Sequence, residues 1–421
     1  MESKGLSKQS PWSEKRGYDQ LHSLCSYLGS YPPSLANYFI KYFTDPGDLV
    51  LDPFSGRGTT ILESRLNKRR SVGSDLNPIA VILSKAKSFK INKKKVFERI
   101  DDLENNFDRA LYFPVADSVE ERIKLIFHKS TITELCYLKS KLKPDENDID
   151  SFICGAILGI LHGGERKDGS SAYLSISMPN TFSMSPDYVR RYIQKNKLNR
   201  DYRNTFVVLR NKIERTLSKH NSPGLGSDIF RCDAKKISTD KKIKRYLKKV
   251  KLVLTSPPYL GIVNYEKQNW IRSWFAKDNY NKTKVNLDAH LDDNLNLNEW
   301  LRFSKTVVEQ IKRTLTKDGV AVFVIGDVKK SQDSIILLAR DFVSMISQNR
   351  LFKNIWVYSD HINKESKTTR IWGETKGTAT AVDRIVIMSD SNPFVNNKRI
   401  KSGHIITHKE IVKCTKDFMG K

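Results

Sequence analysis

Apolar runs and segments of helical spacing alternate along most of this chain. Helical spacing predicts helices at 34–43, from about 78, at 300–315 and at 334–348. Apolar runs typical of buried strands occur near 48–52, 71–74, 228, 251–255, 319–326, 354–359 and 384–388. This alternation predicts an α/β fold in which helices cover a mostly parallel sheet.

Residues 100–222 interrupt the alternation with mostly helical patterns, including 131–142 and 149–161. Two polar, turn-rich segments follow at 163–171 and 178–186, and long polar loops in a compact chain are often functional. We therefore expect an inserted helical domain; the alternative is a helical element that only packs against the rest of the protein. The expected division is a polar lead-in at 1–20, a catalytic domain at 21–99 and 223–392, the inserted domain at 100–222 and a basic extension at 393–421.

A glycine-rich turn follows the first predicted strand. Gly56 and Gly58 allow the backbone to approach a ligand closely, and a helix that starts at Thr59 presents free N–H groups to an anionic group. Asp75 ends the second predicted strand, where an acidic residue is well placed to bind ribose hydroxyls. The alternatives are an ordinary turn at the glycines and a helix N-cap at Asp75.

Two successive prolines follow the predicted strand at 251–255. Proline fixes φ and removes a backbone donor, so Ser256-Pro257-Pro258-Tyr259 makes a stiff turn that offers carbonyl acceptors, a hydroxyl and an aromatic ring. An extruded nucleobase needs a stacking surface and acceptors for its exocyclic amine. The turn therefore suits a base clamp, and the alternative is an ordinary strand-to-loop turn.

Together these motifs resemble the S-adenosylmethionine-dependent DNA amino-methyltransferases, and in particular their N4-cytosine group. The resemblance extends over most of 22–390 and is carried by Tyr31-Pro32-Pro33, Asp52-Pro53-Phe54-Ser55-Gly56-Arg57-Gly58-Thr59-Thr60, 74–78, 232–234, Ser256-Pro257-Pro258-Tyr259 and 319–327. Arg57 departs from the pattern, because many relatives have a small residue there. The resemblance implies a Rossmann-like class I methyltransferase fold with a central seven-stranded sheet, helices on both faces, an antiparallel last strand and an inserted helical domain for target recognition.

The resemblance also implies a cofactor, S-adenosyl-L-methionine, and roles for individual residues. Ser256, Pro257, Pro258 and Tyr259 would grip the target base as the catalytic residues. Asp75 would bind the ribose of the cofactor, and Asp233 would bind its adenine amine. The alternative for Asp233 is a solvated loop residue without a role in binding. The methionine part would lie against Tyr31, Pro32, Asp52, Pro53, Phe54, Gly56, Gly58 and Thr59.

The charge of the chain favours a polyanionic partner. The formal net charge is +26, and a basic surface gives salt-dependent affinity for phosphates, so we expect double-stranded DNA as the partner. The densest basic run, 235–251, leads directly into the strand before Ser256, and we expect it to lie near the DNA backbone.

Other residue types exclude competing chemistries. The five cysteines form no C-x-x-C pair and none follows a proline, so the Pro-Cys nucleophile of cytosine C5 methyltransferases is absent. His404 and His408 lack a third ligand nearby, so no metal is expected. We find no export signal and no apolar stretch long enough to cross a bilayer, and we expect a cytoplasmic protein with no membrane partner.

The sequence therefore predicts a site-specific cytosine-N4 DNA methyltransferase of a restriction-modification or related system, with a cognate restriction endonuclease as partner. A Ser before Pro-Pro-Tyr usually accompanies cytosine N4, whereas Asp or Asn accompanies adenine N6. The alternatives are an adenine-N6 DNA methyltransferase, an RNA guanine amino-methyltransferase and a non-enzymatic DNA-binding specificity protein on this fold.

Overall fold

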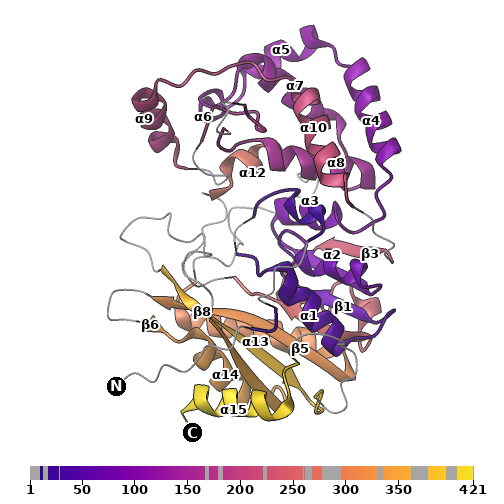
Figure 1. Cartoon of the computed structure of the whole chain (residues 1–421), viewed down its shortest axis with the longest axis vertical. Helices are drawn as coiled ribbons and strands as arrows, with labels where there is room; N and C mark the ends of the chain where they lie inside the picture. The colour runs from indigo at the N-terminus through magenta and orange to yellow at the C-terminus, as the bar shows by residue number, and fades with distance from the viewer. Residues whose placement is uncertain are drawn as a thin grey trace.

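The computed structural model contains a unit built on a sheet and a helical unit above it (Figure 1). The structure describes residues 10–12, 18–27, 29–165, 170–178, 184–220, 225–258, 260, 268–276, 295–329, 335–361, 378–394 and 405–420, with the backbone alone at 378–381. Tyr259 and parts of the polar segments at 163–171 and 178–186 lie outside these residues.

The described strands form one sheet in the order β3-β2-β1-β4-β5-β8-β7, and β6 pairs with the end of β5. The strands are β1 Leu49–Asp52, β2 Arg70–Asp75, β3 Ser227–Arg231, β4 Val250–Thr255, β5 Leu315–Lys329, β6 Ile335–Ile336, β7 Asn354–His361 and β8 Thr378–Ser389. From β3 to β5 all neighbours are parallel, whereas β8 is antiparallel to β5 and β7. This arrangement confirms the predicted Rossmann-like sheet with an antiparallel last strand.

The strand β6 is an addition to the seven strands that the sequence predicts. Helical spacing predicts a helix from 334, but Ile335 and Ile336 pair with Val328 and Lys329, and the helix begins at Leu338. The side chains of β-branched residues such as isoleucine favour a strand over a helix, which explains the later start of the helix.

Helices cover both faces of the sheet, as predicted. They are α1 Pro33–Phe43, α2 Thr59–Leu66, α3 Pro78–Lys85, α13 Leu297–Thr314, α14 Leu338–Gln348 and α15 His408–Met419. Successive residues of a strand point to opposite faces, so Val50 and Leu252 pack with α1 and α15 while Leu51 and Val253 pack with α13 and α14.

The helical unit lies at the top of Figure 1. Its helices are α4 Lys93–Asn105, α5 Arg109–Asp117, α6 Glu121–Lys124, α7 Lys129–Lys141, α8 Asp148–Ile160, α9 Pro186–Asn196, α10 Thr205–Leu217 and α12 Trp270–Ala276. One apolar core joins them to α3 and to the short helix η1, Gln20–Ser23. Helix α12 belongs to this core although it follows β4 in the chain. None of the described helices is long and apolar enough to cross a membrane.

Both described ends of the chain pack against the sheet. Trp12, in the predicted polar lead-in, is 5% exposed, and its Nε1 donates to Asp360 Oδ2 at 2.7 Å at the end of β7. Helix α15, in the predicted basic extension, buries Ile411 in the same core. These segments therefore stabilise the sheet unit.

Candidate active site

A cleft opens where the carboxyl ends of β1, β2 and β4 lie side by side. Ligands bind at this edge in open α/β sheets. The walls consist of Tyr27, Gly29, Pro53, Phe54, Gly56, Asp75, Leu76, Asn77, Cys232, Asp233, Ala234, Ser256 and Pro258. The turns around Gly56 and Pro258, which are far apart in the sequence, therefore border one cleft.

The predicted site residues divide into two groups. Those that line the cleft are Pro53, Phe54, Gly56, Asp75, Asp233, Ser256 and Pro258. The described residues that are not among its lining are Tyr31, Pro32, Asp52, Gly58, Thr59 and Pro257. Tyr259 lies outside the described residues.

Asp52 ends β1 and is 2% exposed. Its carboxylate accepts hydrogen bonds from Thr255 Oγ1 at 2.7 Å, Thr60 Oγ1 at 2.7 Å and Tyr31 OH at 3.2 Å. Burial raises the pKa of Asp52, and these hydrogen bonds oppose the rise. Because Thr60 lies in the first turn of α2 and Thr255 ends β4, this carboxylate fixes the glycine-rich turn relative to the proline turn.

The glycine-rich turn is also held against α3. Gly58 has φ +77°, and a Cβ there would lie 2.9 Å from Ser84 Cα, so the position requires glycine. Lys87 is fully buried and donates from Nζ to the Arg57 carbonyl at 2.5 Å. Burial lowers the pKa of Lys87 to about 7. These contacts hold the backbone of the turn against α3.

Asp75 ends β2 and faces the cleft. Its carboxylate accepts hydrogen bonds from Gly56 N at 3.0 Å and Asn77 N at 2.9 Å. Burial raises the pKa of Asp75 to about 6, against the lowering effect of the two N–H groups. The cap of α3 is Asn77, whose Oδ1 accepts from Ile79 N at 3.0 Å. The alternative interpretation of Asp75 as the helix cap is therefore wrong.

The proline turn is anchored to helix α13 by the buried residue Trp300. The Nε1 of this residue donates to the Pro258 carbonyl at 2.8 Å, and its side chain is 1% exposed in the core under the sheet. A reciprocal capping box between Asn296 and Glu299 fixes the start of α13, which carries Trp300. Neither proline has an N–H group, so this carbonyl contact is an important constraint on the turn.

Asp233 lines the cleft and also caps a short helix. It caps the short helix η2, Ala234–Lys236, by accepting from Lys235 N at 2.9 Å, and its Oδ2 lies 3.7 Å from Lys235 Nζ. Its side chain is 22% exposed. The carboxylate is therefore oriented at the cleft by its own helix cap and is partly open to solvent.

Six residues line the cleft without a role predicted from the sequence, although four of them lie in the motifs 74–78 and 232–234: Tyr27, Gly29, Leu76, Asn77, Cys232 and Ala234. The last four flank predicted residues, so a wider reading of each motif would find them. Tyr27 and Gly29 precede α1 in no recognisable pattern. The Tyr27 hydroxyl accepts from Asn77 Nδ2 at 3.1 Å, and its ring lies beside Gly56, contacts that only the fold creates.

A comparison with protein families identifies the family to which the chain belongs. A family model described as DNA methylase matches residues 4–86 and 250–415. The chain belongs to the DNA methylase family. The matched residues include both turns of the cleft, and the unmatched 87–249 contains helices α4 to α10 together with β3.

Individual relatives carry the name type II methyltransferase. M.MjaII of Methanocaldococcus jannaschii is 32% identical over 145 residues, which cover 33% of this chain and 27% of that protein. M.XycI of Xanthomonas campestris pv. cyanopsidis is 42% identical over 59 residues, 14% of this chain and 20% of its own. M.MvaI of Kocuria varians is 23% identical over 370 residues, 79% of this chain and 78% of its own. The chain thus spans about a quarter of M.MjaII and a fifth of M.XycI.

One solved structure, the rRNA methyltransferase aviRa from Streptomyces viridochromogenes, aligns over 90% of this chain and 94% of its own. The identity is 9% and the TM-score is 0.31. This similarity is too low to relate the functions of the two proteins.

Proposed function

We propose that this chain transfers a methyl group from S-adenosylmethionine to the exocyclic N4 of an extruded cytosine in double-stranded DNA. The observation that carries the proposal is the single cleft bordered by Gly56, Asp75, Ser256 and Pro258. Membership of the DNA methylase family supports the substrate. The names of the relatives support a restriction-modification or related system with a cognate restriction endonuclease.

The residues of the cleft fit S-adenosylmethionine. Asp75 offers a half-buried carboxylate for the ribose hydroxyls, and Asp233, which follows the neighbouring strand β3, offers a second carboxylate for the adenine amine. Gly56 lets the cofactor approach the backbone closely, while Phe54 and Tyr27 offer aromatic surface. When bound, the cofactor supplies an electrophilic methyl group on a sulfonium. Asp52, Tyr31 and Thr60 support this wall through their hydrogen bonds.

Cofactor affinity should fall as the pH is lowered through about 6, where Asp75 gains a proton. Its carboxylate accepts hydrogen bonds from ribose hydroxyls, and a protonated carboxyl has less acceptor capacity. Asp75→Asn should weaken binding about tenfold at neutral pH and should remove the pH dependence. Calorimetric titration with S-adenosylmethionine between about pH 5 and pH 8 measures both effects.

Loss of folding does not explain the expected fall in affinity. The pKa of Asp75 in the folded chain lies above its ordinary value of 3.8, so its contribution to stability is greatest at low pH and decreases as the pH rises from about 4 to 6. A variant with asparagine that keeps the wild-type pH profile would contradict a direct contact between Asp75 and the cofactor.

The proline turn supplies the positioning that the transfer needs. An exocyclic amino nitrogen is a weak nucleophile because its lone pair is delocalised into the ring. Hydrogen bonds from its protons to Ser256 Oγ and the Pro257 carbonyl localise the lone pair and direct it at the methyl carbon. Trp300 already binds the Pro258 carbonyl, so we assign the Pro257 carbonyl to the base. Tyr259 stacks on the extruded ring.

No strong base is required for this reaction. The bound cofactor would supply the methyl group and leave as a neutral thioether once the new N–C bond replaces the S–C bond, and the additional proton on the amino nitrogen would pass to solvent. Asp52 is not suited to accept that proton, because its carboxylate is buried and bound by Thr255, Thr60 and Tyr31.

Cytosine is preferred to adenine because serine precedes Pro257 and Pro258. The second candidate is an adenine-N6 methyltransferase, which the family equally includes. An RNA guanine amino-methyltransferase and a DNA-binding specificity protein without chemistry are the third and fourth candidates.

The decisive experiment identifies the product. The full chain is incubated with isotopically labelled S-adenosylmethionine and unmethylated plasmid or total RNA, and the nucleosides are analysed by mass spectrometry. Labelled N4-methylcytosine from DNA is the expected product. Labelled N6-methyladenine or a labelled RNA guanine would replace the proposal by the corresponding candidate. A chain that binds no cofactor in calorimetry would establish the non-enzymatic one.

A further inference from the structure

The lysine-rich run at 235–251, which the sequence predicts to lie near the DNA backbone, is in large part remote from the cleft. It re-enters the sheet at Val250, the amino end of β4. Lys249 and Arg245 border a separate cavity at that edge. The six residues of β4 then span roughly 20 Å before Ser256. The densest part of this run is badly placed to hold the DNA beside an extruded base.

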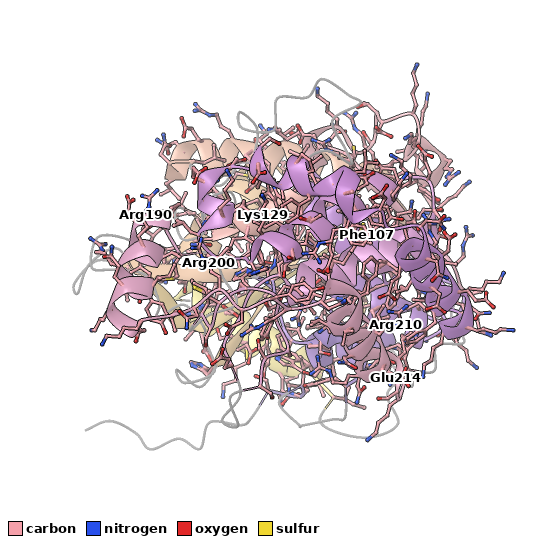
Figure 2. The ribbon with its side chains drawn as sticks, turned by 90° about the horizontal axis from the view of Figure 1, so that it is seen from above. Phe107, Lys129, Arg190, Arg200, Arg210 and Glu214 are labelled. Atoms are coloured by element: carbon pink, nitrogen blue, oxygen red, sulfur yellow. The ribbon has the colours of Figure 1, made fainter. Side chains whose placement is uncertain are left out.

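A second basic surface lies on α9, at the rim of the helical unit (Figure 1). Figure 2 shows Arg190 of this helix far from Arg210 of α10. In α9 only Val189 is buried. The exposed basic residues are Arg190, Arg191, Lys195 and the capping residue Lys197, against the single acidic residue Asp187. We call these four basic residues the α9 basic face.

Helix α9 is connected to the cleft through α12. Trp270 of α12 donates from Nε1 to the Met184 carbonyl at 2.8 Å, two residues before α9 begins. Arg272 of α12 is 1% exposed and donates from Nη2 to Ser26 Oγ at 3.0 Å, next to the cleft residue Tyr27. Two hydrogen bonds and one buried helix therefore fix the base of α9 relative to the cleft wall.

Side chains on the exposed side of α9 contact one another as well as carrying charge. Tyr188 and Tyr192, one turn apart, stack with ring centroids 6.0 Å apart and an interplanar angle of 16°. Asp187 pairs with Arg190 at 2.8 Å, one turn further along. The helix thus presents cations and two partly exposed aromatic side chains from a defined backbone.

We infer that the α9 basic face binds the phosphate backbone of the duplex that flanks the extruded base. This inference rests on the proposed function, because it takes DNA as the partner. A helix with four exposed cations complements a duplex that carries closely spaced phosphates, and phosphate contacts fix the position of a protein on DNA without reading the sequence. The contact would hold the duplex while the cleft receives a single base.

The experiment compares two variants that each lose two exposed charges. Arg191→Gln with Lys195→Gln changes the α9 basic face, and Lys241→Gln with Lys242→Gln changes the basic run by the same charge. Glutamine has about the helix propensity of the residues that it replaces. Fluorescence anisotropy with a mixed-sequence, unmethylated duplex gives the slope of log affinity against log salt for each variant.

We expect the slope of the α9 variant to decrease by about 1.8, since each lost phosphate contact removes about 0.9, and the slope of the Lys241 and Lys242 variant to stay at the wild-type value. Equal slopes for all three proteins, an equal decrease in both variants, or a decrease confined to the Lys241 and Lys242 variant would each overturn the inference. Calorimetry should give the same cofactor affinity for all three. The identity of the methylated product tests the proposed function separately, because the salt slope does not depend on catalysis.

Discussion

Ser256→Ala is expected to slow methyl transfer about 10²-fold, with a much smaller effect on cofactor affinity. In the proposed mechanism the hydroxyl is the side-chain acceptor that orients the amino nitrogen, and a misplacement of about 1 Å between reacting groups costs on the order of 10²-fold in rate. The end of β4 should stay in place, since Thr255 still donates to Asp52 at 2.7 Å. Single-turnover kinetics at saturating cofactor and DNA isolate the transfer step. A wild-type rate would contradict the role of Ser256.

A second variant tests whether the orientation of the proline turn affects the rate independently of the Ser256 hydroxyl. Trp300→Phe keeps an aromatic ring in the core but removes the donor to the Pro258 carbonyl, and the expected loss of rate is about tenfold. Trp270→Phe serves as the control, because it removes a hydrogen bond of the same 2.8 Å length, from Trp270 Nε1 to the Met184 carbonyl. At saturating DNA its rate should equal that of the wild type. Equal losses in both variants would indicate a general effect of tryptophan removal.

Much of the candidate site can be predicted from local sequence patterns. Gly56, Asp75 and Ser256 each come just after, or at the end of, an apolar run, and parallel strands bring such positions to one edge of a sheet. Asp52 shows the limit of this reasoning. Its place in the motif predicts a cofactor contact, yet its carboxylate is bound by three side chains of its own chain, a network that appears only when β1, β4 and the helices are assembled.

Long-range packing explains what sequence patterns leave out. Trp12 lies in a polar segment, but burial against Tyr38 and a bond to Asp360 place it in the sheet core. A lone tryptophan has no periodicity that could indicate this. Helix α12 follows the proline turn in the chain, yet the helical unit buries its Trp270 and Phe275. Such placements depend on the shape of partners that are distant in sequence.

The same dependence makes Gly159 a sensitive position of the helical unit. A Cβ at Gly159, in α8, would lie 1.9 Å from the carbonyl oxygen of Leu24. That oxygen belongs to backbone and cannot turn aside as a flexible side chain would. The segment that contains Leu24 continues to Tyr27 and Gly29 on the cleft wall. A single methyl group in α8 should therefore displace part of the cleft wall.

Gly159→Ala should destabilise the folded chain by about 3 kcal/mol, the upper end for overpacking a well-packed contact, although alanine alone would favour the helix by about 1 kcal/mol. Thermal unfolding should show a lower Tm than the wild type, and calorimetry should show a lower affinity for S-adenosylmethionine. Gly155→Ala in the same helix is the matched control. Its Cβ would lie 3.0 Å from Leu24 Cδ2, which can rotate away, and 3.0 Å from Ala86 Cβ, a contact that a small shift between the two helices relieves. If Gly159→Ala kept the stability and cofactor affinity of Gly155→Ala, the segment before α1 would not be docked on α8, and the wall that Tyr27 and Gly29 give to the cleft would have to be reassigned.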